Sequence, residues 1–223
     1  MLRQAQHERN QLVTVRPELV EGFIQHFLRY LMSSKEKILA TAIILFAEKG
    51  FVGLSMRQLA QAVDMSVATI YHHFPDKKAL YLAATRYAFS GKEAVFAQVW
   101  EAQCPAAEKL QLFVLALISV MSQDREFCRL VQREIMEADP ERMQLLAESV
   151  FKNQFDLLLQ LASELAPERD AFLVATSIVG LVKVYVDHQP LNQYFPGWQP
   201  AFAQPETIAA HVTDLLLNGL IAK

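Results

Sequence analysis

Glycine, cysteine and alternating apolar–polar stretches are all scarce in this sequence. Only seven glycines are present in 223 residues, and no stretch has the two-residue period of a half-buried strand. We also find no apolar run of about 20 residues, the length that spans a membrane. The N-terminus lacks the pattern of a secretory signal. These absences predict an all-α, cytoplasmic protein without a membrane partner, whose two cysteines remain thiols.

Motifs for catalysis and metal binding are missing as well. The sequence contains no G-x-S-x-G, no glycine-rich phosphate loop and no C-x-x-C. His72 and His73 are neighbours on a predicted helix, so their side chains diverge by about 100° and do not form an i, i+4 metal pair. His188 and His211 have no ligand partner at metal spacing. We therefore expect no metal, no cofactor and no enzymatic activity.

The composition favours a folded protein with extensive buried or interface surface. Apolar residues make up 52% of the chain, slightly above the usual range of about 45–50%. Charge is distributed unevenly, because residues 33–90 hold seven Lys and Arg against four Asp and Glu, whereas residues 91–223 hold ten against seventeen. A basic segment attached to an acidic body is typical of a nucleic-acid-binding domain joined to another domain.

The most specific pattern lies between Leu54 and Lys78. Ser55 and Gln58 have the spacing of a capping box that begins a short helix. Asp64 interrupts this helix, and Asp tolerates the left-handed backbone of a tight turn. The inner face is expected to contain Leu59, Ala62 and Val63.

A second short helix follows the turn directly. Ser66 is suited to cap its N-terminus, and Ile70 and Phe74 are spaced to face inward together. Pro75 ends the helix, and Asp76 is placed to cap the next one. Two short helices joined by a tight turn are typical of a helix-turn-helix, whose second helix enters the DNA major groove.

The outward side chains of this region suit contact with double-stranded DNA. Small residues at the start of the second helix allow the backbone to approach base edges, and their methyl groups can pack on thymine. Lysines at the next helix N-terminus suit a phosphate. The predicted DNA-binding residues are Ser55, Arg57, Val67, Ala68, Thr69, Tyr71, His72 and Lys77.

Residues 33–87 resemble the DNA-binding domain of the TetR family of bacterial transcriptional regulators. The resemblance rests on ILATAIILFAEKGF, RQLAQAV and S-x-A-T-I-Y-x-H-F-P-x-K-x-x-L. It implies a three-helix helix-turn-helix domain over residues 33–79 and a helical ligand-sensing and dimerisation domain over residues 80–223. It also implies a repressor that a small-molecule effector releases from a palindromic operator. Family members usually carry Gly where this chain has Asp64, which bears on the operator sequence.

Residues 1–32 do not fit this pattern. The segment is polar at first and lacks cap signals, and VRPELVEG resembles the translation of a bacterial intergenic repeat. We expect Met32 to be the true start, with residues 1–32 a start-site artefact or a disordered leader. The alternative is a basic arm that touches the DNA backbone.

The body is predicted to be built from apolar helices. Leu110–Met121 is nearly all apolar and predicts a buried central helix, while Phe172–Val186 is apolar on every side except at Lys183. A proline-rich loop after Val186 precedes a last helix over Glu206–Ile221. The family resemblance implies that the last two helices form a four-helix bundle in a homodimer; the alternative is that Phe172–Val186 is central in one chain. The predicted interface residues are Ile178, Leu181, Val182, Val212, Leu216 and Leu220.

A pocket for an apolar or aromatic effector is predicted in the body, which is rich in Phe and Met. Lys183 either meets an acidic group of the effector or extends to solvent. Core packing explains the aromatic residues equally well, so both interpretations stay open. The predicted pocket residues are Phe96, Trp100, Leu117, Met121, Phe127, Phe151, Phe155 and Tyr185.

Two functions are therefore open at this point. The first is a DNA-binding repressor in which the effector shifts the population toward a state whose two DNA-binding domains are moved off their half-sites. The second is a dimeric helical module that binds a protein and no DNA. The capped second helix and its flanking lysines favour the first.

Overall fold

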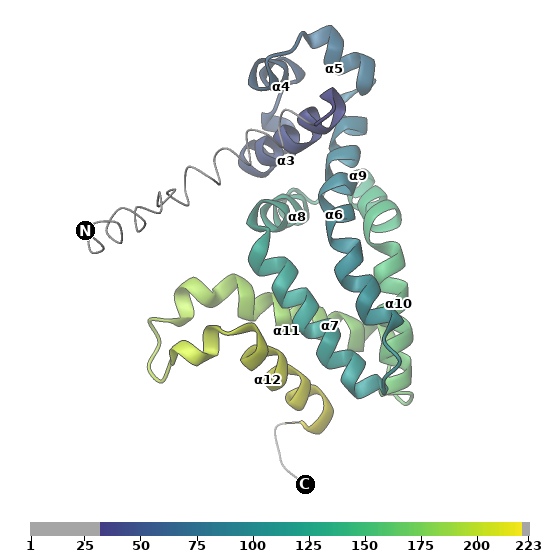
Figure 1. The fold of residues 1–223 in the computed structure, drawn as a ribbon, viewed down its shortest axis with the longest axis vertical. Coiled ribbons are helices and arrows are strands. Elements are labelled where there is room, and N and C mark those ends of the chain that lie inside the picture. Colours follow the sequence, from purple (N-terminus) through teal and green to yellow (C-terminus); the bar gives the residue numbers. More distant parts are fainter. Residues whose placement is uncertain (1–31, 220–223) are drawn as a thin grey trace, which may run out of the picture. The chain divides into compact units, whose positions relative to one another are not determined.

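Figure 1 shows a computed structural model that describes residues 32–219, and every regular element in that range is a helix. The all-α prediction is confirmed. Among the described residues, 39–219 belong to one compact unit, and 32–38 belong to a separate one. The predicted leader, apart from Met32, and the predicted interface residue Leu220 lie outside the described residues.

Three helices form what we call the head, residues 39–76: the continuation of α3 (Ser34–Gly53), then α4 (Met56–Val63) and α5 (Val67–His73). The predicted capping is confirmed. The N–H of Gln58 donates to Ser55 Oγ at 3.2 Å, and the N–H of Ser55 donates to Gln58 Oε1 at 2.9 Å. Asp64 adopts the left-handed conformation at φ 56° and ends α4.

The inner face of α4 differs from the prediction at one position. Leu59 and Val63 are buried as expected, but Ala62 is exposed and Ala60 is buried in its place. Together with Met56, the buried residues follow the i, i+3, i+4, i+7 spacing of one helical stripe. Ala62 lies outside that stripe, which is why the prediction was wrong there.

The remaining helices form the body. The central helix is α7, which contacts α6, α8, α10, α11 and α12 and buries Leu110, Phe113, Val114 and Ile118, as predicted. A π-helical turn, η1, joins α9 to α10. The elements are α6 (Lys77–Glu101), α7 (Ala106–Gln123), α8 (Arg125–Glu137), α9 (Pro140–Leu146), η1 (Ala147–Phe151), α10 (Lys152–Leu165), α11 (Ala171–Asn192), η2 (Pro200–Ala203) and α12 (Pro205–Asn218).

Helices α7 and α11 correct two expectations. Both are long and apolar enough to cross a membrane, so the prediction that no such run exists was wrong. The most apolar stretch of α7 is 33% buried and that of α11 is 22% buried, so packing within the chain covers less of α11. Helix α11 also continues through Pro190 to Asn192, where a loop was expected.

Gly50 breaks α3 at a backbone conformation that other residues avoid. Its φ is 73° and its ψ is 174°, a region that is essentially restricted to glycine. A Cβ atom there would lie 2.3 Å from Glu137 Oε1 and 2.6 Å from Arg133 Nε. Gly53 closes the same helix with an ordinary φ, and a Cβ there would meet only Lys49 Cβ at 3.5 Å.

Replacing Gly50 therefore tests this break in α3. We expect Gly50→Ala to lower the free energy of unfolding by about 1–3 kcal/mol, because the new Cβ adds backbone strain and a steric clash. Gly53→Ala is the matched control and should leave stability within about 0.5 kcal/mol. Urea unfolding followed by circular dichroism measures both variants, and equal midpoints would contradict the requirement for glycine at position 50.

Candidate functional site

Helix α5 is held by its two ends and its inner face. The N–H of Thr69 donates to Ser66 Oγ at 3.0 Å, and the two hydroxyl oxygens lie 2.8 Å apart. Ile70 and Phe74 are buried and anchor the inner face. The outward side chains of α5 are therefore not needed to keep the helix folded.

The predicted DNA-binding residues occupy this outward surface to different degrees. Tyr71 is 49% exposed, and Ser55, Arg57, Ala68 and His72 are also exposed. Val67 and Thr69 are half-buried at the start of α5. The Ser55 side chain is already engaged in the capping box of α4.

Lys77 lies at the start of α6, as expected, and its ammonium also has contacts within the chain. Its Nζ donates to the carbonyl of Val52 at 3.3 Å and lies 4.7 Å from the centroid of the Phe51 ring. Partial burial, followed by the nearby charge of Arg142, lowers the pKa of Lys77. Its ammonium is thus held by the end of α3. Lys78 pairs with Glu141 of α9.

A mainly apolar cavity of about 340 Å³, here called the central cavity, lies between α6, α7, α8, α10 and α11. Its wall includes a cluster of aromatic rings, in which the ring centroid of Phe89 lies 5.4 Å from that of Phe151 and 5.9 Å from that of Phe127. The structure brings six of the eight residues predicted for a pocket into this lining: Phe96, Leu117, Met121, Phe127, Phe151 and Phe155.

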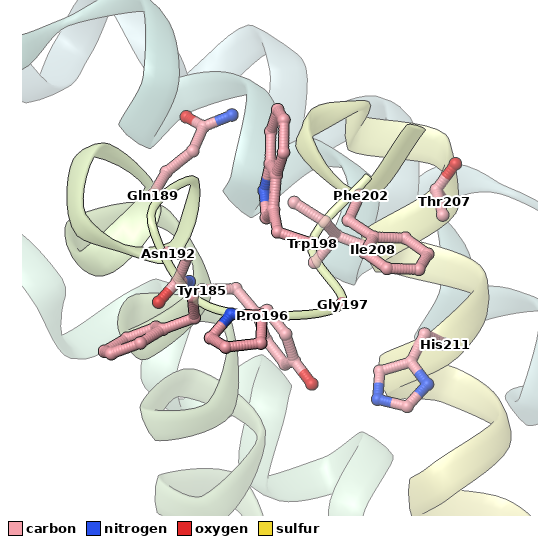
Figure 2. Close-up of a pocket in the computed structure, with 11 residues that line it drawn as sticks. Tyr185, Gln189, Asn192, Pro196, Gly197, Trp198, Phe202, Thr207, Ile208 and His211 are labelled. Carbon is pink, nitrogen blue, oxygen red and sulfur yellow. The ribbon is translucent and has the colours of Figure 1, made fainter. Parts of the chain in front are cut away.

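The other two predicted pocket residues lie elsewhere. Trp100 stands behind the wall, where its Nε1 donates to Gln154 Oε1 at 2.7 Å and its ring lies 5.4 Å from that of Phe113. Tyr185 lines a separate aromatic cavity of about 580 Å³. Figure 2 shows that this second cavity is formed by α11, the following loop and α12, with Trp198 and His211 among its lining residues.

Apart from Lys183, the polar groups of the central cavity were not predicted from the sequence. Three polar residues lie one helical turn from an apolar lining residue: Gln132, Gln154 and Thr176. The helical period could therefore have predicted them. Lys183 lines the cavity and pairs with Asp187 on the same helix. Cys128 also lines it; burial, then the nearby Asp124 carboxylate, raises the pKa of its thiol.

The predicted dimer interface needs correction at three positions. Ile178, Val182 and Val212 are at most 1% exposed within a single chain, so they pack in its core and cannot contact a partner. Leu181 and Leu216 are half-buried. The exposed residues of α11 instead include a stripe at helical spacing, namely Leu173, Ser177, Gly180, Val184, His188 and Leu191. Phe172, Thr176 and Pro190 are also exposed but lie outside this stripe.

The part of the chain that the structure describes holds no group of three or more His, Cys, Asp or Glu that could bind a metal ion.

Comparison with known proteins identifies the N-terminal region. Residues 38–84, which run from α3 into α6, match the model of the bacterial regulatory proteins of the tetR family. This segment of the chain therefore resembles the N-terminal region of the tetR family. It is 32% identical over 106 residues to the probable HTH-type transcriptional regulator YttP of Bacillus subtilis, covering 47% of this chain and 51% of YttP. The chain thus spans about half the length of this relative.

Two further proteins extend the comparison. The biofilm operon negative transcriptional regulator IcaR of Staphylococcus aureus is 38% identical over 55 residues, which cover 25% of this chain and 30% of IcaR. The transcriptional regulator FadR of Bacillus subtilis, solved in complex with stearoyl-CoA, superposes with a TM-score of 0.67. That match covers 83% of this chain and 99% of FadR at 19% identity, so it shows a shared fold.

Proposed function

We propose that the protein is a cytoplasmic, homodimeric repressor that binds a palindromic operator and is released by a ligand in the central cavity. The observation that carries this proposal is α5, a capped helix anchored from below whose outer side chains are free to meet DNA. The match of residues 38–84 to the tetR family supports the same function, and the similar protein IcaR is named a negative regulator.

The DNA contact is assigned to the outer surface of α5. Ala68 and the adjacent Thr69 present small side chains at the helix start, which lets the backbone approach base edges. Tyr71 and His72 continue the exposed surface and are suited to phosphate or base contacts. Arg57 on α4 adds positive charge on the exposed side of that helix.

The ligand is proposed to have an apolar chain or ring and one acidic group. The central cavity falls at the small end of the usual range of about 300–1,000 Å³ for ligand sites, and mainly apolar side chains line it. Lys183 supplies a positive charge at its wall. The complex of the similarly folded FadR with stearoyl-CoA favours an acyl chain as the apolar part.

The dimer is proposed to form through the exposed stripe of α11 and the adjoining surface of α12. Leu173 and Val184 are 65% and 53% exposed, which leaves large apolar side chains in water in an isolated chain. A Cβ added at Gly180 would meet no atom within 4 Å, so the stripe is open at its middle. A groove of about 710 Å³ between the two helices includes Leu216 and Leu217.

Tyr71→Ala tests the DNA contact. We expect the affinity for DNA from the region upstream of the gene to fall about tenfold, equivalent to about 1.4 kcal/mol, because an exposed contact side chain is lost. Fluorescence anisotropy at fixed salt measures the affinity, and the melting temperature should not change. Tyr194→Ala, at a tyrosine that is 78% exposed in the body, is the control and should bind normally.

If the wild-type protein showed no salt-sensitive binding to any palindrome from that region, the DNA-binding proposal would fail. A dimeric module that binds another protein would then become the better account.

Leu117→Trp tests the central cavity. The larger indole should fill the space between α7 and the facing helices, and we expect stearoyl-CoA binding to weaken at least tenfold by titration calorimetry. Leu112→Trp is the control, since Leu112 is on the same helix, 41% exposed and outside the cavity lining. Equal binding by both variants would place the ligand elsewhere, including the cavity beside Tyr185.

Val184→Glu tests the dimer. A carboxylate in the middle of the exposed stripe would be buried without a partner, so we expect monomers in sedimentation velocity. Val95→Glu introduces the same change at an exposed valine of α6 and should remain dimeric. A dimer that persists in Val184→Glu would exclude this stripe as the interface.

A further inference from the structure

The head is joined to the body covalently only through α6. A domain attached by one helix can bend and rotate about it unless a second contact fixes its orientation. The structure contains such a contact, where the last turn of α3 meets α8 and the start of α9. Its members come from segments far apart in the sequence: Phe51, Glu134, Glu137 and Arg142.

Arg142 is the centre of this contact. Its Nε lies 3.0 Å from both carboxylate oxygens of Glu134, and its Nη2 donates to Glu137 Oε2 at 2.9 Å. The side chains of Arg142 and Glu134 are 8% and 2% exposed. The N–H of Arg142 also donates to Asp139 Oδ1 at 2.9 Å, which fixes the start of α9.

The flat guanidinium of Arg142 is turned toward the head. Its Cζ lies 4.2 Å from the centroid of the Phe51 ring, a cation–π distance. Phe51 in turn packs against Tyr81 of α6, with ring centroids 5.5 Å apart. The Phe51 ring thus lies between Arg142 of α9 and Tyr81 of α6.

A hydrogen bond to the backbone of α3 and a glycine in α3 allow the head to approach α8 this closely. Arg133 Nη1 donates to the carbonyl of Glu48 at 2.9 Å. Gly50 leaves no side chain where Glu137 and Arg133 approach α3. The break of α3 at Gly50 then places Phe51 beside Arg142.

The same helix that holds Arg142 also forms part of the central cavity. On α8, Cys128, Val131, Gln132 and Ile135 line the cavity at i, i+3, i+4 and i+7, and Phe127 lines it from the stripe that also holds Glu134. Glu134 and Glu137 belong to a neighbouring stripe of that helix. A shift of α8 on one side therefore moves the carboxylates that orient Arg142 on the other.

We infer that Arg142 is a positioning residue that locks the head to the body through Phe51 and passes movements of α8 to the head. The consequence for DNA binding rests on the proposed function, but the lock itself is a property of the chain. In the proposed role, Arg142 acts through Phe51 and contacts neither DNA nor ligand.

The direct test measures the head–body distance in the full chain. Keto-bearing amino acids replace Gln61 on α4 and Gln160 on α10, which are both exposed, and are then spin-labelled. Labelled chains are diluted with unlabelled protein, so that only distances within one chain are measured by pulsed electron paramagnetic resonance. The lock predicts a narrow distance distribution in the otherwise unchanged protein. It predicts a distribution about twice as wide when the contact is removed.

The contact is removed in two ways. Glu134→Gln/Arg142→Met eliminates both buried charges together, because removing one alone would leave the other unpaired and endanger folding. Phe51→Leu keeps an apolar side chain but removes the ring, and decides the question if the double variant does not fold. Arg129→Met is the control, since Arg129 lies on α8 with a 61% exposed side chain paired to Glu126.

A narrow distribution in a folded double variant, or in Phe51→Leu if the double variant is unfolded, would overturn the lock. A second measurement is the affinity for the upstream DNA, which should fall about tenfold in the double variant while its melting temperature is retained. If the wild-type protein bound no DNA, the proposed function would fail, and the distance measurement would still decide whether Arg142 locks the head.

Discussion

The buried carboxylate of Glu134 constrains much of this structure. A charged group that is 2% exposed must be paired, and Arg142 provides that pairing through its Nε–H, which is shared between both oxygens of the carboxylate. Breaking one partner of such a pair typically costs about 3–5 kcal/mol. The requirement ties α8 to α9 and places the guanidinium beside the head. Burial, together with the negative charge of Glu134, also raises the pKa of the neighbouring Tyr81 hydroxyl, which therefore stays protonated.

Local signals in the sequence were sufficient for the head. The caps at Ser55, Ser66 and Asp76 and the left-handed turn at Asp64 depend on residues within three or four positions of one another, and each was predicted correctly. The same short range explains why the contact of Lys77 within the chain was not predicted. Its ammonium is held by the carbonyl of Val52, which is 25 residues away in the sequence.

Longer-range features of the body could be predicted only in part. The helical period correctly predicted six residues of the central cavity, because each lies on an inward stripe. It could not show that Tyr185 lines a different cavity. The π-helical turn over Ala147–Phe151, which leads to the ring of Phe151, carries no clear sequence signal. For α11, hydrophobicity on all sides did not tell which side the chain itself buries, and so Val182 was assigned to the wrong surface.

The support of α5 from within has a consequence for how such a protein can diversify. Its hold on the fold comes from the Ser66 cap, whose hydroxyl is engaged by the backbone of the helix, and from two buried side chains, Ile70 and Phe74. Mutations at Ala68, Tyr71 or His72 thus carry little penalty in folding. Gene duplicates that keep the cap and the two anchors can acquire new nucleotide preferences one substitution at a time, without first having to regain a stable scaffold.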